Sequence, residues 1–256
     1  MGGRNLCFIP CRYYSSRLPG KPLLKINNKT IIRLVYEQVK KARAIDHIIV
    51  LTDDLRIKEE VDTFAPHGAC FMTGKAENGT ERIVNFIKKA WNKFPYDTLV
   101  NVQGDEPFIN PKNIDLCVEN YWNKKDKIVD MKCSTLHYIY NNFDDIFHRS
   151  NGKLVLDKSN NILYASRNII PGLKQKPHDK KLKYYGHIGV FVFDAIYLID
   201  EYLNDKTPYQ LSEDIEWLKI LEDGYKINSI LVSEESHERG VDVQDDYDYL
   251  KNKYEK

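Results

Sequence analysis

The first 120 residues alternate between short apolar runs and amphipathic segments, and this alternation constrains the fold more than any other feature. Runs rich in β-branched residues predict buried strands. Four such runs lie at residues 6–10, 47–52, 69–72 and 99–102. The predicted helices that follow them cover about residues 31–43, 55–64, 81–91 and 111–122. Strict alternation of this kind is typical of an α/β fold with a doubly wound, mostly parallel sheet.

The chain changes character after residue 125. Strand-like segments lie at residues 131–139, 153–165 and 187–193. Because no helical pattern separates them clearly, we expect a smaller antiparallel addition that forms a lid or a dimerisation arm. A lysine-rich polar loop at 174–183 lies within it. Further along, a helix capped by Ser212, a strand and a last helix are predicted at 213–222, 226–232 and 243–253.

Composition excludes several classes of function. The chain of 256 residues holds 38 Lys and Arg against 37 Asp and Glu, so non-specific nucleic-acid binding is not expected. No apolar run reaches the length of a membrane span. The five cysteines are scattered without a C-x-x-C pair, which favours reduced thiols. Since a strand-like segment begins at once, without room for a signal peptide, we expect a cytoplasmic protein that binds neither membrane nor nucleic acid.

A carboxylate follows the fourth predicted strand directly. The strand at 99–102 is succeeded by Gln103, Gly104 and Asp105. In open α/β sheets, ligands bind just outside the carboxyl ends of the strands. One interpretation is that Asp105 lies at the mouth of a pocket and faces a metal or a substrate. The other is an ordinary turn in which Asp105 caps the next element. This segment alone leaves both open.

The loop after the first strand is rich in phosphate-binding residue types. Arg12, Ser15, Arg17 and Lys21 lie within ten residues, and Gly20 allows close approach of the backbone. Arginine supplies paired donors to phosphate oxygens and lysine supplies a compact cation. The loop matches neither the Walker pattern nor G-x-G-x-x-G. Because the cations follow a buried strand, we favour a phosphate site over the alternative, a solvated basic loop.

Four motifs, in order, resemble one family. They are I-P-C-R-Y-Y-S-S-R-L-P-G-K-P-L at 9–23, N-G-T-E-R at 78–82, N-V-Q-G-D-E-P at 101–107 and G-V-D at 240–242. This set resembles the CMP-Kdo synthetases, the 3-deoxy-manno-octulosonate (Kdo) cytidylyltransferases, and spans nearly the whole chain. Relatives that activate sialic acid have R-G-G-S-K in place of residues 12–17. The resemblance therefore favours the Kdo type.

The resemblance implies a Rossmann-like nucleotidyltransferase. Such an enzyme transfers CMP from CTP to the anomeric hydroxyl of Kdo, an acidic 2-ulosonic sugar, and releases pyrophosphate. The product, CMP-Kdo, feeds surface polysaccharide synthesis, including lipopolysaccharide and capsule. The resemblance also implies Mg²⁺, a homodimer formed through about 131–200, and a single domain, 1–256. Within it we expect a nucleotide-binding core at 1–125, a sugar-binding and dimerisation section at 126–210, and a return to the core at 211–256.

Site residues are carried over by motif. The resemblance assigns the triphosphate to Arg12, Ser15, Arg17 and Lys21, and the cytosine to Asn78 and Gly79. It assigns Mg²⁺, a hard ion that prefers oxygen ligands, to Asp105 and Asp242. Lys21, Arg17 and Asp105 form the implied catalytic set. For residues 80–82, a helix cap with a solvated first turn is an alternative that can hold alongside the nucleotide role.

The sugar site rests on the resemblance alone. The resemblance assigns it to Gln103, Arg167, His187 and Glu216. By themselves, His187 could be an ordinary strand-end histidine and Glu216 a surface residue of an amphipathic helix. The family has glutamine where this chain has Trp217, and such a change alters which substituents are accepted. Two alternatives therefore stay open: the same reaction on an amino-substituted or sialic-acid-like sugar, and a nucleotide-binding module without catalysis.

Overall fold

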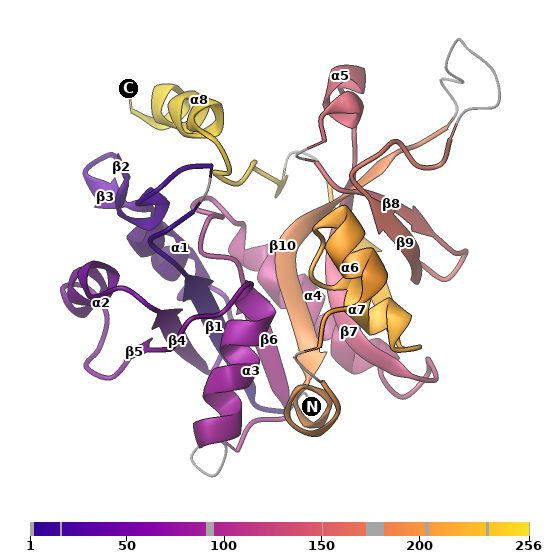
Figure 1. The fold of residues 1–256 in the computed structure, drawn as a ribbon, viewed down its shortest axis with the longest axis horizontal. Coiled ribbons are helices and arrows are strands. Elements are labelled where there is room, and N and C mark those ends of the chain that lie inside the picture. Colours follow the sequence, from indigo (N-terminus) through magenta and orange to yellow (C-terminus); the bar gives the residue numbers. More distant parts are fainter. Residues whose placement is uncertain are drawn as a thin grey trace.

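A computed structural model describes residues 3–15, 17–90, 95–149, 151–172, 182–202, 205–233 and 236–255. Its centre is one mixed sheet with the strand order β11-β7-β10-β6-β1-β4-β5 (Figure 1). The parallel half consists of β1 (Asn5–Cys11), β4 (His47–Thr52), β5 (Cys70–Met72) and β6 (Thr98–Val102). All seven residues of β1 are buried, as expected for a strand covered on both faces. The predicted mostly parallel α/β fold is confirmed.

Helices follow these strands as predicted and cover both faces of the sheet. They are α1 (Ile31–Val39), α2 (Leu55–Asp62), α3 (Gly79–Ala90) and α4 (Pro111–Lys124). Side chains of Thr30, Asp54 and Asn110 cap α1, α2 and α4 by accepting backbone N–H groups. The apolar residues of α1, α2 and α4 pack on one face of the sheet, with those of α8 (Gln244–Tyr254). Those of α3 pack on the other face.

The antiparallel strands of the middle section continue the central sheet. They are β7 (Met131–Ile139) and β10 (Tyr185–Asp194), and β10 runs antiparallel to both β6 and β7. The late strand β11 (Lys226–Leu231) then lies parallel to β7. The predicted strand at 153–165 is two strands, β8 (Lys153–Leu156) and β9 (Ile162–Ser166), joined by a turn with Asn160 at φ 63°. This hairpin pairs with the start of β10.

The predicted helix at 213–222 is wrong. Two short helices occupy this region, α6 (Pro208–Glu213) and α7 (Leu218–Glu222). Ser212 lies inside α6, and its predicted position as the N-cap falls to Thr207, whose N–H donates to Gln210 Oε1 at 3.4 Å. Asp214 adopts a left-handed conformation (φ 52°) that ends α6. The chain between the two helices therefore carries Glu216 and Trp217 on a turn.

Several smaller elements lie outside the predicted pattern. They are the hairpin β2 (Lys25–Ile26) and β3 (Lys29–Thr30), the short helix α5 (Phe143–Phe147) and a π-helical turn at Tyr197–Glu201. The lysine-rich loop predicted at 174–183 lies mostly outside the described residues. Every helix in the described part of the chain is too short or too polar to cross a bilayer.

Candidate active site

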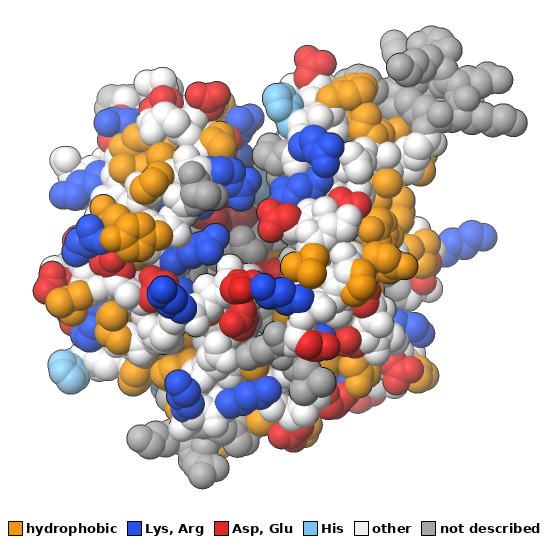
Figure 2. Space-filling model, viewed as in Figure 1, with side chains coloured by type: hydrophobic (Ala, Val, Ile, Leu, Met, Phe, Trp, Pro, Cys, Tyr) orange, Lys and Arg blue, Asp and Glu red, His pale blue; other side chains and the backbone are white. Residues whose placement is uncertain are grey.

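A cavity of about 320 Å³ opens at the carboxyl ends of β1 and β6 and reaches across to the α6–α7 turn. Figure 2 shows charged side chains of both signs around the hollow between the two halves of the molecule. The lining includes every residue that the motifs assigned to the site: Arg12, Ser15, Arg17, Lys21, Asn78, Gly79, Gln103, Asp105, Arg167, His187, Glu216 and Asp242. The fold thus brings together residues that lie up to 230 positions apart, from 12 to 242.

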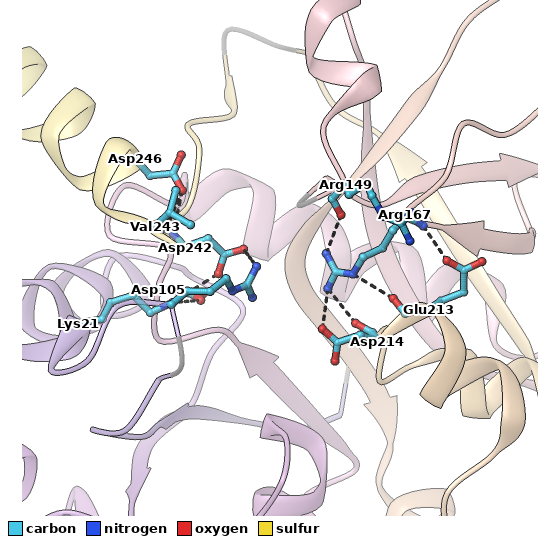
Figure 3. A network of polar contacts seen from close by, with 10 residues as sticks. Lys21, Asp105, Arg149, Arg167, Glu213, Asp214, Asp242, Val243 and Asp246 are labelled. Carbon is cyan, nitrogen blue, oxygen red and sulfur yellow. Dashed lines mark hydrogen bonds and ion pairs between the residues drawn. The ribbon is translucent and has the colours of Figure 1, made fainter.

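Lys21 forms ion pairs with two carboxylates on the β1–β6 side of the cavity (Figure 3). Its Nζ lies 2.7 Å from Asp105 Oδ2 and 3.6 Å from Asp242 Oδ1. Arg17 Nη1 adds a contact of 3.3 Å to Asp242 Oδ2. Although burial opposes the charge on Lys21, the two aspartates raise its pKa, so the ammonium is fully charged. Two cations and two carboxylates therefore neutralise one another here.

Two glycines allow this arrangement. Gly20 has φ 72°, and its N–H donates to Tyr13 O (2.8 Å), so the loop folds back just before Lys21. Gly104 lies where the ends of β1 and β6 meet. A Cβ there would lie 2.9 Å from Pro10 O, closer than real Cβ atoms come to backbone. The absent side chain at 104 therefore lets the Asp105 turn sit directly over the first strand.

Asp242 reaches Asp105 through the backbone. The N–H of Val241 donates to the carbonyl of Asp105 at 2.8 Å, which holds the two turns together. Burial and the neighbouring Asp105 both raise the pKa of Asp242. The alternative that Asp105 only caps the next helix is wrong, because Asn110 caps α4. Asp105 instead faces the cavity.

This pair of carboxylates fits a metal that is shared with phosphate. Within the described residues there is no cluster of three or more His, Cys, Asp and Glu suited to holding an ion alone. Mg²⁺ usually takes one or two carboxylates and completes its shell with substrate phosphates and water. Asp105 and Asp242 match that donor set, and the cations beside them suit the phosphates.

Glu216 lies on the α6–α7 turn and bonds to the N-terminus of α3. Its two carboxylate oxygens accept the N–H of Gly79 (3.1 Å) and the hydroxyl of Thr80 (3.0 Å). Burial raises its pKa, and these hydrogen bonds act in the opposite direction. Glu216 is therefore no surface residue of an amphipathic helix. Through these two hydrogen bonds, Glu216 connects the α6–α7 turn to the turn at Asn78 and Gly79, which lies on the opposite wall of the cavity.

The first turn of α3 is not solvated either. Arg82 is 2% exposed, and its Nη2 lies 2.7 Å from Asp53 Oδ2. Its Nη1 also donates to Thr73 Oγ1 and to the carbonyl of Gly74. The alternative of a solvated first turn at 80–82 is wrong for Arg82, which is buried and lines the cavity.

Arg167, at the end of β9, is held mainly by main-chain carbonyls (Figure 3). Its Nε donates to Glu213 O at 2.9 Å and its Nη2 to Asp214 O at 2.8 Å. Its Nη1 donates to Arg149 O at 3.4 Å. The carboxylate of Asp214 also lies 3.3 Å away, but that side chain is 88% exposed. The guanidinium is therefore oriented by backbone rather than neutralised by a buried acid.

His187 on β10 offers a neutral imidazole. Burial, with the nearby Arg167, lowers its pKa to about 4. Its buried Nδ1 has no hydrogen-bond partner among the described residues. Trp217 packs edge-on against it with ring centroids 5.7 Å apart and is 3% exposed. The histidine thus adds a neutral ring to the cavity lining beside an aromatic wall, while its Nδ1 is covered from solvent.

The sequence analysis missed two buried ionisable residues at this site. Glu106 follows Asp105 and accepts the N–H of Gly189 at 3.2 Å. Burial and Asp105 raise its pKa to about 8. The one feature of the sequence that pointed to Glu106 is its place in the motif at 101–107. Lys153 at the start of β8 is fully buried, and a lone lysine at a strand end gave no signal for that.

The fold and the charged cavity define an α/β nucleotidyltransferase. In a comparison with solved structures, CMP:2-keto-3-deoxy-manno-octonic acid synthetase complexed with CTP matches with a TM-score of 0.84 and 28% identity, over 97% of both chains. The 4-diphosphocytidyl-2C-methyl-D-erythritol synthase, at a TM-score of 0.60 and 13% identity, shares the fold.

Sequence comparison narrows the class to one family. The cytidylyltransferase family model matches residues 6–229. The 3-deoxy-manno-octulosonate cytidylyltransferase of Fusobacterium nucleatum is 37% identical over 96% of this chain and 95% of that protein. The enzyme of the same name from Protochlamydia amoebophila is 36% identical over 96% and 92%. The chain belongs to the cytidylyltransferase family.

Proposed function

We propose that this protein transfers CMP from CTP to the anomeric hydroxyl of 3-deoxy-manno-octulosonate and releases pyrophosphate. The observation that carries the proposal is one cavity with two unlike walls. Lys21, Asp105 and Asp242 lie on one wall and Arg167 lies on the other (Figure 3), with His187 in the cavity lining beside Gly152. The names and the high coverage of the relatives support the same reaction.

The first wall suits a nucleoside triphosphate. Arg12, Ser15, Arg17 and Lys21 supply cations and donors for the phosphates, and Lys21 is placed to stabilise charge at the α-phosphate. Asn78 and Gly79, at the start of α3, are proposed to contact the cytosine. Asp105 and Asp242 would hold Mg²⁺, which supplies charge neutralisation and lowers the pKa of the attacking hydroxyl. Binding of CTP would give Lys21 and Arg17 new partners in place of the aspartates.

The second wall suits an acidic sugar. The Arg167 guanidinium, already oriented by carbonyls, would pair with the sugar carboxylate. Neutral His187 and Gln103 would contact hydroxyls, because neither carries a charge that must be paired. The hydrogen bond from the Gly79 N–H to the Glu216 carboxylate would set the distance between the nucleotide and the acceptor sugar. These placements bring the hydroxyl and the α-phosphate together, which converts a bimolecular step into a nearly intramolecular one.

Trp217 favours a second candidate acceptor. The ring lines the cavity beside His187, and the family has glutamine at this position. A less polar wall suits an ulosonic acid in which a hydroxyl is replaced, for example by an amino or acylamino group. We therefore keep an amino-substituted ulosonate as the alternative acceptor in the same reaction.

The protein is proposed to act as a homodimer in the cytoplasm. The 131–200 section is proposed as the contact, within a single domain divided at 125 and 210. Leu163 supports this, because it is 61% exposed on β9, whose single partner among the described strands is β8. All five cysteines are buried and unpaired, which suits a reducing compartment. Light scattering at twice the chain mass is expected, and a monomer at micromolar concentration would contradict the dimer.

The test is pyrophosphate release from CTP and Mg²⁺ with a panel of acceptors. The panel contains Kdo, an amino-substituted Kdo and sialic acid. We expect the highest kcat/KM with Kdo. A preference for the amino-substituted sugar would support the second candidate. Turnover of sialic acid alone would overturn the Kdo assignment, and no turnover with any acceptor would leave only nucleotide binding.

A further inference from the structure

Lys153 is a charged side chain with no exposed surface. It begins β8, and its relative exposure is 0%. Its Nζ donates three hydrogen bonds: to His148 O at 3.0 Å, to Asn151 O at 2.7 Å and to Arg167 O at 2.6 Å. An ammonium group has three N–H donors, so all of them are used. Each bond ends on a main-chain carbonyl.

This environment differs from that of the other two buried lysines. Lys21 pairs with Asp105 and Asp242, and Lys219 pairs with Asp205 and Asp223. Among the described residues, no carboxylate lies within ion-pair distance of Lys153, and the more distant Glu213 only partly offsets the fall of its pKa. Burial, reinforced by Arg167 and Arg149, lowers its pKa to about 8, so it remains mostly charged at neutral pH. A buried cation without a carboxylate partner is unfavourable for stability, which suggests that its position serves another purpose.

The three bonds join two segments that line the acceptor side. We call residues 148, 149, 151 and 152 the carbonyl loop. Lys153 binds its carbonyls at 148 and 151, while Arg167 Nη1 binds the one at 149. The third bond of Lys153 holds the main chain of Arg167 itself. The Lys153 ammonium therefore fixes the carbonyl loop to the main chain of Arg167. The same loop also contacts the Arg167 guanidinium.

The carbonyl loop also sets the position of His187. Gly152 packs so closely on the imidazole that a Cβ there would lie 3.2 Å from Nδ1. Gly152, Arg167 and His187 all line the cavity. A shift of the loop would therefore move both polar groups of the acceptor wall. Nothing comparable links Lys153 to Lys21 or Asp105 on the nucleotide wall.

We propose that Lys153 is a positioning residue for the acceptor: its ammonium holds the carbonyl loop against Arg167, so that the Arg167 guanidinium and the His187 ring keep their orientation. This rests on the proposed transfer to an acidic sugar. Lys153 itself lies beneath the wall and does not line the cavity. Its removal takes one donor from each of three part-buried carbonyls, of which the one at 148 keeps the N–H of Asn151, and this loosens the loop.

The test compares steady-state constants for Lys153→Met and wild type. The KM for Kdo is expected to rise at least about tenfold, because misplacement of the guanidinium weakens a charge-assisted pair. The KM for CTP is expected to stay within about twofold, since the nucleotide wall is untouched. Lys219→Met is the matched control. It removes an equally buried ammonium that lies outside the cavity lining, and we expect it to lower stability without changing the KM for Kdo.

The outcomes separate this inference from the proposed function. Equal rises of both KM values, or an unchanged KM for Kdo, would overturn the role of Lys153. If Lys153→Met does not fold, Lys153→Gln keeps two donors and is measured in the same way. If wild type shows no turnover, the proposed function fails. Calorimetric titration with Kdo then decides. Binding that is at least about tenfold weaker in the variant than in wild type supports the role. Equal affinities, or no detectable binding by wild type, overturn it.

Discussion

The two walls of the cavity hold their charges in different ways. On the nucleotide wall, side chains pair with side chains: Lys21 and Arg17 contact Asp105 and Asp242, and Arg17 and Asp242 are 42% and 38% exposed. On the acceptor wall, most bonds to charged groups come from backbone: carbonyls orient Arg167 and Lys153, and Glu216 accepts an N–H group of α3 together with the Thr80 hydroxyl.

The difference indicates how each wall meets its ligand. The pair of Arg17 with Asp242 joins partly exposed groups, so it is weak and screened by solvent, and a metal–triphosphate can replace it while giving the buried Lys21 new anionic partners. Groups fixed by backbone hydrogen bonds keep their geometry before the ligand arrives, which reduces the ordering cost of binding. The nucleotide wall is therefore rearranged on binding, whereas the acceptor wall is preorganised.

The strongest test of the nucleotide wall is Asp105→Asn. The amide keeps the shape but removes the charge that holds the metal, so kcat is expected to fall by about 10³-fold or more. The free energy of unfolding should fall by about 1–3 kcal/mol, because Lys21 is buried and keeps only Asp242 as a charged partner. Asp54→Asn is the control, since asparagine caps α2 as well as aspartate does. Near-normal turnover in the Asp105 variant would remove it from the metal site.

Arg167→Lys tests the acceptor wall. Lysine keeps the charge but loses the planar fork that the carbonyls at 213 and 214 orient. We expect the KM for the sugar to rise by about 10- to 100-fold, with the KM for CTP unchanged. Arg33→Lys, in a surface pair with Glu37 on α1, should change neither constant. A larger effect on CTP than on the sugar would contradict the division into two walls.

Trp217→Gln sharpens the account of acceptor choice. The variant restores the residue typical of the family, and we expect the ratio of kcat/KM values for Kdo and the amino-substituted sugar to change by about tenfold. Loss of a buried indole should also lower the free energy of unfolding by about 3 kcal/mol. If the variant stays folded with an unchanged ratio, Trp217 does not select the acceptor.

The acceptor half also predicts a pH dependence of stability, in which each histidine contributes a modest amount. Burial lowers the pKa values of His137, His187 and His237 to about 4. Unfolded histidine titrates near 6.5, so the unfolded chain binds more protons between pH 6.5 and 4, and stability falls as pH falls through that window. By pH 5 the loss is about 1–2 kcal/mol per histidine, measurable by urea unfolding.

His137→Asn gives a matched check of this pH effect. His137 is 2% exposed and contacts Ser229 Oγ at 2.8 Å, away from the lining of the acceptor cavity. Asparagine keeps a polar group but cannot take up the proton. The variant should therefore lose less stability than wild type between pH 6.5 and 5. An identical slope in the two proteins would show that His137 does not contribute.

Local patterns predicted most of the fold and the nucleotide wall. Strand–helix alternation leaves a strong periodic signal, and phosphate-binding residue types gather in one short loop after β1. The break between α6 and α7 could not be predicted, because residues 213–222 read as one helix and the left-handed conformation of Asp214, which ends α6, leaves no clear sequence signal. The burial of Lys153 could not be predicted for a related reason. Its partners are the carbonyls at 148, 151 and 167, and only the fold brings them together.

The most direct test of the two-wall account is detection of CMP-Kdo by mass spectrometry in reactions of the wild-type protein. CTP, Mg²⁺ and Kdo are supplied together, and in parallel reactions each is omitted or EDTA is added. The account predicts one CMP-Kdo for each pyrophosphate released, and none when any component is missing or chelated. Product formed in EDTA, or pyrophosphate released without Kdo, would contradict it.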